Sequence, residues 1–299
     1  MSDRFVLMYH RVCERGPQTR CWFERGTAVT PAALDLHLTW LGQRFDVVPL
    51  ADLAESTSAG DRARVALTFD DGYADTLEVA APICARHGVT AACFACAGPP
   101  VQGTTPWFDT WYTLVHAGLD RPDWSRIVTH LGFPPALDLA ACVVGPPKQW
   151  LANLRAPHRD EVLARLAHTL EAPLLERLQL DLEGLRRLRA HGWRIGGHGV
   201  DHVRLADSDA ETVDRELDGS LRLLADLGET GPPLFAYPDG SWSASVVDTI
   251  GLAGFAVACT TDPGPWTADT HRLLVPRLFC RGDAPSPHHL LGDERGKPA

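Results

Sequence analysis

The sequence predicts an α/β fold in which parallel strands close into a barrel, and two observations lead to this prediction. Short apolar runs alternate with segments of helical periodicity, as repeated strand–helix units do. Polar residues that could carry chemistry stand directly after several of these runs. Catalytic groups of parallel barrels occupy that position, because the loops after the strands converge on one mouth.

The predicted elements follow one another along the chain. The predicted strands are the apolar runs at 5–12, 64–69, 89–97, 193–197, 234–237, 255–260 and 273–279. The predicted helices are one that begins at residue 31 and those at 74–87, 182–191, 210–227 and 243–252. Thr30 and Pro31 suit the start of a helix, and Gly88 and Gly192 suit the end of one.

The stretch 99–180 departs from this rhythm. Proline-rich turns separate helical patches, so we expect a mostly helical insertion or cap on a barrel that spans residues 1–281. An aromatic cluster within the insertion consists of Trp107, Phe108, Trp111 and Tyr112. Such a cluster either stacks on a sugar ring or packs the cap against the barrel. Residues 282–299 are rich in proline and charge and are predicted to be a flexible tail.

Composition narrows the classes of partner. The 299 residues carry a formal net charge of −10, which repels nucleic acid and anionic lipid, so we expect neither as a partner. No apolar run reaches the ~20 residues of a membrane helix, and the N-terminus has the pattern of a strand rather than of a signal peptide. The eight cysteines are scattered in mostly apolar surroundings, as reduced core thiols are. These features predict a cytoplasmic protein.

Two adjacent carboxylates follow the predicted strand 64–69. Asp70 and Asp71 repel each other, and a divalent cation beside them offsets that cost. One carboxylate can then bind the metal while the other faces a bound water. Gly72 allows the tight turn after them. A solvated turn that caps the next helix is the simpler alternative, because turns of this composition are common.

Two histidines follow the predicted strand 193–197. We expect His198 and His202, four residues apart, to meet on one face of a helical turn, where both imidazoles can reach one metal. Two histidines in a loop without a metal are the alternative. With one aspartate they make a ligand set that leaves coordination positions open, which is typical of catalytic rather than structural metal sites.

These motifs together resemble the polysaccharide deacetylase family, the NodB-homology enzymes of carbohydrate esterase family 4. Thr-Phe-Asp-Asp-Gly at 68–72 is similar to the first motif of the family, and His-Gly-Val-Asp-His at 198–202 to the second. Tyr-His-Arg-Val at 9–12 and Phe-Ala-Tyr-Pro-Asp-Gly at 235–240 resemble motifs of one large branch. The resemblance covers roughly residues 5–98 and 180–280, and it implies a distorted (β/α)7-type barrel, with a circularly permuted strand order as an option.

The resemblance also implies roles for individual residues. Asp71, His198 and His202 would hold a divalent metal, with zinc as the default and cobalt or nickel as alternatives. Asp70 would be the general base that deprotonates a water on the metal. A backbone N–H near Tyr73 would contact the oxyanion together with the metal, and Tyr237 and Arg277 are further candidates for contacts with the oxyanion or the substrate.

The sequence departs from the family pattern at three places. The late Leu-x-His motif that supplies the general acid in many members is absent, and we propose His10 in its place. A histidine at a strand end that bonds to backbone is the alternative interpretation of His10. Gly199 stands where Ser or Thr is usual, and Ala236 where an arginine orients the catalytic aspartate. Arg277, in the last predicted strand, could supply that charge.

The expected function is hydrolysis of the N-acetyl group of an amino sugar, in a biosynthetic glycan or a sugar precursor, by a metal-activated water. Deformylation of a sugar or hydrolysis of another C–N amide on the same scaffold is the alternative within enzymes. A non-catalytic sugar-binding module is the alternative of another class. The intact pair of aspartates argues against it, because binding alone needs no group that activates water.

Overall fold

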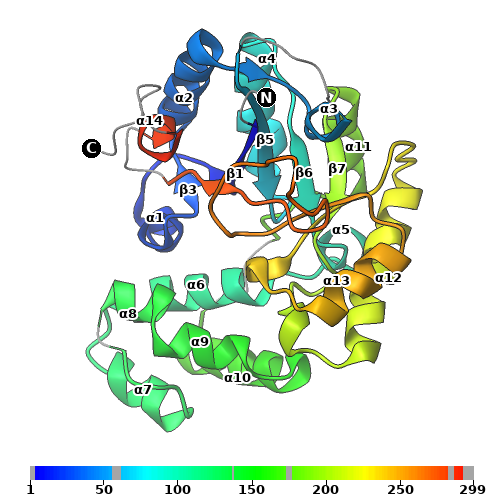
Figure 1. Cartoon of the computed structure of the whole chain (residues 1–299). Helices are drawn as coiled ribbons and strands as arrows, with labels where there is room; N and C mark the ends of the chain where they lie inside the picture. Colours follow the sequence, from blue (N-terminus) through cyan, green and yellow to red (C-terminus); the bar gives the residue numbers. More distant parts are fainter. Residues whose placement is uncertain (1–3, 56–61, 137, 173–176, 282–285, 292–299) are drawn as a thin grey trace.

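A curled sheet of parallel strands forms the centre of the computed structural model, which describes residues 4–55, 62–136, 138–172, 177–281 and 286–291 (Figure 1). Its strand order is β10-β1-β5-β6-β7-β8-β9, and the short β4 (Asp46–Val47) pairs with β5. The bounds are β1 Arg4–Tyr9, β5 Arg64–Asp70, β6 Ala92–Ala95, β7 Arg194–Gly197, β8 Leu234–Ala236, β9 Val257–Cys259 and β10 Leu278–Phe279. The predicted α/β barrel is therefore confirmed.

The segment 272–279 connects the two ends of this strand order. Its first half bonds to β9, with Val275 N–H donating to Ala258 O at 2.9 Å and Thr260 N–H to Val275 O at 2.8 Å. Its second half, β10, pairs with β1. The predicted single strand is thus split, because Pro276 lacks the N–H that a continuous ladder needs.

Two other predicted elements are also interrupted. The strand expected at 5–12 breaks at His10 into β1 and β2 (Arg11–Val12), and β2 pairs with β3 (Ala28–Val29) in a separate two-stranded sheet. The helix expected at 74–87 consists of a π-helical segment, Thr76–Ala80, followed by α4 (Ala81–Arg86). Pro82 has no N–H to donate to the carbonyl four residues earlier, so a regular α-helix cannot run through this point.

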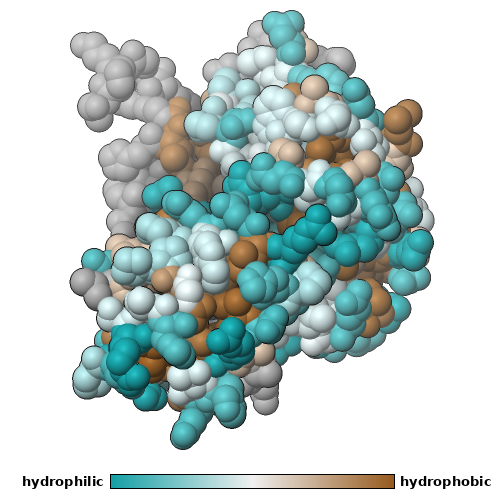
Figure 2. Space-filling view, turned by 90° about the horizontal axis from the view of Figure 1, so that it is seen from below, coloured by the Kyte–Doolittle hydropathy of each residue, from teal (hydrophilic) through white to brown (hydrophobic). Residues whose placement is uncertain are grey.

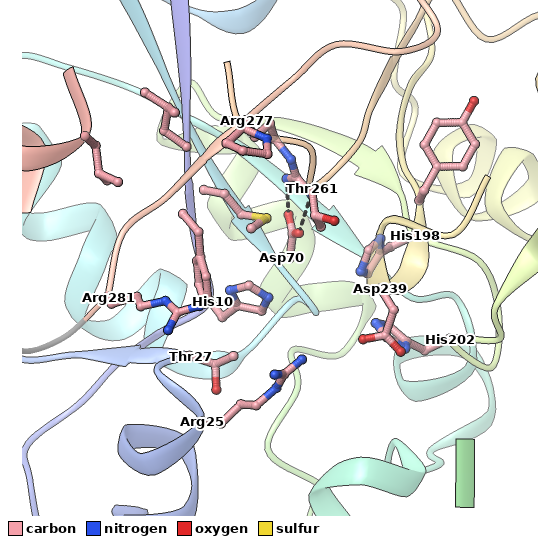
Figure 3. Close-up of a pocket in the computed structure, with 16 residues that line it drawn as sticks. His10, Arg25, Thr27, Asp70, His198, His202, Asp239, Thr261, Arg277 and Arg281 are labelled. Atoms are coloured by element: carbon pink, nitrogen blue, oxygen red, sulfur yellow. Dashed lines mark hydrogen bonds and ion pairs between the residues drawn. The ribbon is translucent and has the colours of Figure 1, made fainter. Parts of the chain in front are cut away.

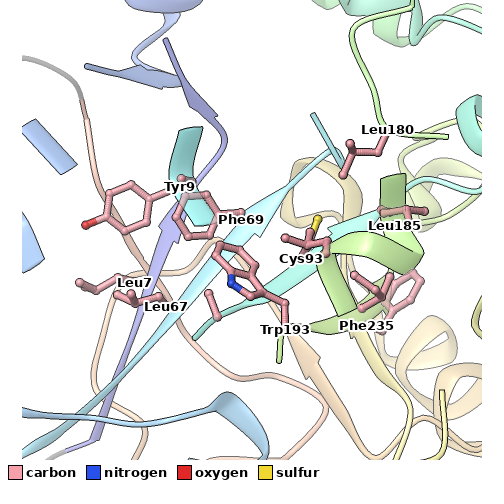
Figure 4. Packing of buried hydrophobic residues seen from close by; sticks show 14 of the residues in the cluster. Leu7, Tyr9, Leu67, Phe69, Cys93, Leu180, Leu185, Trp193 and Phe235 are labelled. Carbon is pink, nitrogen blue, oxygen red and sulfur yellow. The ribbon is translucent and has the colours of Figure 1, made fainter. Parts of the chain in front are cut away.

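Helices cover the outside of the barrel. They are α2 Pro31–Arg44, α3 Leu50–Glu55, α4, α11 Leu182–Ala190, α12 Ala210–Asp226 and α13 Ala244–Leu252. Thr30 caps α2 as predicted, because its side chain accepts a hydrogen bond from Ala33 N–H. Between helices and sheet lies a core in which the rings of Tyr9, Phe69 and Trp193 follow one another at centroid separations of 5.1 Å (Figure 4).

The insertion between β6 and β7 is helical: its first helix, α5 (Gly98–Gln102), lies beside the barrel, and the helices after it form a separate layer below the barrel (Figure 1). The helices of this layer are α6 Trp107–Gly118, α7 Trp124–His130, α8 Leu139–Val144, α9 Pro146–Ala152 and α10 Ala156–Leu170. Seen from below, its surface is largely hydrophilic, with smaller apolar patches (Figure 2). We call this layer the cap. It has its own hydrophobic core, to which the N-terminal α1 (Arg20–Arg25) contributes Trp22 and Phe23.

The aromatic cluster of the insertion belongs to this core. Its four members are each at most 6% exposed. Trp111 stacks on Phe133 with ring centroids 5.2 Å apart. Phe108 instead reaches the barrel mouth, where its ring lies 4.8 Å from that of His202. The cluster therefore packs the cap, and one end of it reaches the candidate site.

The predictions for the C-terminal tail, the cysteines and membrane helices can be compared with the structure. Within 282–299, expected to be a tail, residues 286–291 form α14 (Ser286–Leu291), and the other residues lie outside the described ones. The eight cysteines form no disulfide, and all but Cys13 are buried. Among the described helices, none combines the length and the apolar character that crossing a membrane requires.

A buried carboxylate in the cap, Asp109, joins three parts of the chain. It accepts hydrogen bonds from Trp22 Nε1 at 2.9 Å, from Tyr73 OH at 2.8 Å and from Gln179 Nε2 at 2.6 Å. The donors belong to α1, to the loop after β5 and to the segment that returns from the cap. Asp109 is fully buried, so water does not compete for these hydrogen bonds. They hold the cap against the loop that carries Asp70 and Asp71.

Replacing Asp109 with alanine is expected to lower the free energy of unfolding by about 2–4 kcal/mol, because three buried donors lose their acceptor. Asp109→Asn keeps one acceptor oxygen and should cost less. Urea unfolding followed by circular dichroism measures both values. Equal stability of Asp109→Ala and the wild type would show that this carboxylate does not hold the cap.

Candidate metal centre and active site

The loops after β5 and β7 bring three predicted ligands together. Asp71 Oδ1 lies 3.5 Å from Nε2 of His198 and 3.5 Å from Nε2 of His202. One ligand atom from each of the three residues lies within 4.8 Å of the others, and all three side chains are buried. Residues more than 120 positions apart in the sequence therefore meet at one point, as a shared ion requires.

The conformation of the histidine loop differs from the expected helical turn. Gly199 has φ of +75° and His202 φ of +51°, so residues 198–202 form an irregular loop. The fully buried Glu216 of α12 holds this loop, because its Oε2 accepts hydrogen bonds from Val200 N–H at 2.7 Å and Asp201 N–H at 3.0 Å. These two hydrogen bonds to Glu216 replace the backbone hydrogen bonds that a helical turn would make.

Glu216 also accounts for the glycine at position 199. A Cβ atom there would lie 2.7 Å from Glu216 Oε2, and the positive φ disfavours any other residue. The sequence held a signal for Glu216: it lies on the face of the predicted helix 210–227 that Val213, Leu217 and Leu224 turn toward the core. A charged residue in such a stripe needs a buried partner.

Hydrogen bonding orients His198 toward the centre. Its Nδ1 donates to Ala236 O at 2.7 Å, so Nε2 is the ring nitrogen that faces Asp71. The backbone carbonyl of Ala236 thus orients a metal-ligand candidate, although the family has an arginine side chain at this position. Burial lowers the pKa of His202 to about 4, so this imidazole is neutral and its ring nitrogens can act as ligands.

The donor set fits a divalent cation. Asp71 Oδ1 is buried and has no hydrogen-bond partner among the described residues. Asp71 also has φ of +70°, a strained conformation for a residue other than glycine. A cation would satisfy the orphaned oxygen, and one oxygen with two nitrogens suits zinc.

Arg277 lies against Asp70, at the end of β5. Its Nη1 and Nη2 donate to the two carboxylate oxygens at 2.7 Å each, and both side chains are buried. Arg277 also donates to Thr260 O and to Thr68 Oγ1, so its position is fixed by neighbouring strands. Burial favours the neutral form of Asp70, but the guanidinium holds the pKa of this carboxyl below its usual value.

His10 stands in the break between β1 and β2 and lines the same cavity as Asp70 and Arg277. Its ring contacts Phe279, with centroids 5.3 Å apart. Its Nδ1 is buried without a hydrogen-bond partner among the described residues, so the backbone-bonded interpretation does not hold for that atom. Figure 3 shows the imidazole directed into the cavity from the side opposite His198.

The two tyrosines are bound to structural partners. Tyr73 donates its hydroxyl to Asp109, in the cap, and Tyr237 donates its hydroxyl to Leu273 O at 2.8 Å. Both side chains are buried, and both residues line hollows of the site. Their hydroxyl groups are thus engaged away from the metal ligands.

A cavity of about 440 Å³ opens beside these groups (Figure 3). His10, Asp70, His198 and Arg277 line it, together with Asp239, which belongs to the 235–240 motif but had been given no role. Arg25 also lines it, although it comes from α1 in a part of the sequence without motifs. The cavity volume is sufficient for a small ligand such as one sugar unit.

Comparison with known proteins gives two kinds of similarity. Among structures, the fold is similar to the Streptococcus pyogenes deacetylase PplD in complex with acetate, with 16% identity, a TM-score of 0.63 and 95% of each chain covered. It is also similar to IcaB from Ammonifex degensii, with 14% identity, a TM-score of 0.58 and coverage of 95% of this chain and 94% of that one. At such identities the likeness concerns the fold. No curated protein sequence gives a significant match.

The sequence comparison is more specific, although it covers part of the chain. Residues 165–258 match the family described as polysaccharide deacetylase. The matched range contains both histidines of the candidate centre and the 235–240 motif. The match supports the resemblance drawn from the motifs for this part of the chain, while the motifs at 9–12 and 68–72 lie outside the matched residues.

Proposed function

We propose that the protein is a divalent-metal-dependent hydrolase that removes the N-acetyl group from an amino sugar of a glycan or a sugar precursor. The observation that carries the proposal is the buried group Asp71, His198 and His202 beside the Asp70 carboxylate in one cavity. The family match and the structural likeness to deacetylases support the choice of an acyl group on a carbohydrate.

Asp71, His198 and His202 would hold the ion, and zinc, cobalt and nickel all accept such ligands. A bound divalent ion lowers the pKa of water and polarises a carbonyl group. Asp70 stays ionised because of Arg277 and accepts the proton of the attacking water. His10 lies across the cavity and, when protonated, donates to the nitrogen that leaves as the C–N bond breaks. Acetate and a free amino sugar are the products.

The Asp70→Asn variant tests the proposal most simply. It removes the proton acceptor but keeps the shape of the side chain, so acetate release should fall at least about 10²-fold while the metal content stays unchanged. Acetate is measured after incubation of the zinc-loaded protein with N-acetylglucosamine oligosaccharides, and zinc by mass spectrometry. Asp218→Asn, an exposed change on α12, is the matched control and should keep full activity.

The same assay separates the alternatives. Release of formate from N-formyl sugars with no acetate from N-acetyl sugars would replace deacetylation by deformylation. A zinc-loaded wild type that binds the sugars and releases neither acid would be a binding module, and the proposed hydrolysis would be wrong.

Replacing His10 with glutamine should show whether it protonates the leaving group. Hydrolysis of the N-acetyl sugar is expected to fall about 10²-fold, because an amine anion leaves poorly. Hydrolysis of 4-nitrophenyl acetate should change much less, since nitrophenolate leaves without a proton. The ratio of the two rates is compared with that of His158→Gln, an exposed control. Equal losses on both substrates would assign His10 a structural role instead.

A further inference from the structure

The cavity at the metal centre continues along the cap. A smaller hollow beside Asp71 shares Arg25, His202 and Asp239 with it. A third hollow of about 410 Å³ shares Arg25 and Asp239 in turn, and most of its other lining residues belong to the cap. We call this third hollow the cap groove; the argument uses Arg25, Lys148, Gln149, Asn153, Arg204 and Asp239 from its lining.

The charged residues of the cap groove are mostly cations. Arg25 ends α1, Lys148 belongs to α9, and Arg204 lies in the loop after β7. Asp239 is the one carboxylate in the lining. This excess of positive charge is local, because the whole chain carries a net charge of −10. A region of opposite sign to the rest of the protein attracts ligands that the remaining surface repels.

Two of the three cations are available to a ligand. Arg204 already pairs with Asp207. Arg25 and Lys148 make no ion pair with another described residue, and both are only half exposed. Lys148 extends over the face of Trp107, with its Nζ 5.9 Å from the ring centroid, so the cap core supports its position. Asp239 compensates part of their charge: burial alone would raise the pKa of its carboxyl, but Lys148 and Arg25 lower it. One carboxylate in the lining does not balance three cations, so an anion from outside would offset the remaining cost of burying them.

The position of these cations relates them to the reaction site. Arg25 lines all three hollows, and in Figure 3 its guanidinium points into the cavity below His10. Gln149 and Asn153 add neutral amides that can bond to sugar hydroxyls. A ligand with one end at the metal ligands therefore has its next portion between an arginine and a lysine. Arginine binds phosphate or carboxylate through two parallel hydrogen bonds, and lysine adds a point charge.

We propose that the cap groove binds an anionic substituent, a phosphate or a carboxylate, carried by the same glycan whose N-acetyl group lies at the metal centre. This inference rests on the proposed function and adds a substrate class to it. The substrate would then be an acidic amino-sugar compound, rather than a neutral chain of N-acetylglucosamine.

Three substrates test the inference: N-acetylchitotriose, the same trisaccharide with a phosphate monoester, and the trisaccharide extended by a glucuronate. The wild type should have at least about tenfold higher kcat/KM on an anionic form than on the neutral one, and salt should reduce the difference. The preferred form shows whether the anion is phosphate or carboxylate. Lys148→Gln and Arg25→Gln should each reduce the ratio about five- to tenfold, and the double variant should abolish it.

Arg222→Gln is the matched control, because it removes an exposed charge on α12 and should leave the ratio unchanged. Calorimetric binding of the already deacetylated phosphorylated and glucuronate-bearing trisaccharides tests the groove without turnover, so that a failure of catalysis does not obscure the result. Tighter binding of either than of neutral deacetylated trisaccharide, lost in the double variant, supports the inference. Equal kcat/KM and equal affinity for neutral and anionic forms would overturn it, while acetate release from all three would leave the proposed deacetylation standing.

Discussion

The structure depends on one unfavourable arrangement: a carboxylate oxygen of Asp71 is buried between two imidazoles, and no described residue donates a hydrogen bond to it. Burying such a group is costly unless a cation accompanies it. Its surroundings hold the arrangement in place. The strand ends of β5 and β7 bring the three residues together, the Ala236 carbonyl fixes the tautomer of His198, and Glu216 replaces the helical bonds of the histidine loop. The fold thus maintains a strained, electron-rich point, which is a strong argument for an ion there.

The base beside this point depends on the end of the chain. Arg277 reaches Asp70 only because the segment 272–279 bonds first to β9 and then to β1, and so joins the ends of the sheet. The segment that joins the two ends of the sheet therefore also carries the arginine that orients the proposed base. The loop after β5, which carries Asp70 and Asp71, also depends on the cap, because Tyr73 in this loop donates a hydrogen bond to Asp109. The cap groove then extends the site toward the solvent with charge opposite to that of the rest of the chain.

Sequence reasoning predicted the parts that follow from simple periodicity. Alternating apolar runs predicted the parallel barrel, and the position after the strands singled out Asp70, Asp71, His198 and His202. It failed where a distant partner decides local structure. The loop 198–202 is not helical because Glu216 takes its N–H groups, and the last strand is split by Pro276. Asp109, Arg25 and Lys148 carry no motif, since their importance arises from packing between cap and barrel, which periodicity does not describe.

X-ray absorption at the zinc edge of the zinc-loaded protein tests the central claim most directly, because it reports the ligands of the ion independently of any activity. The account predicts one ion with two imidazole ligands at about 2.0–2.1 Å and one carboxylate oxygen at about 2.0–2.2 Å. It also predicts that His202→Ala leaves a single imidazole. A zinc ion without histidine ligands, or a spectrum that His202→Ala does not change, would contradict it.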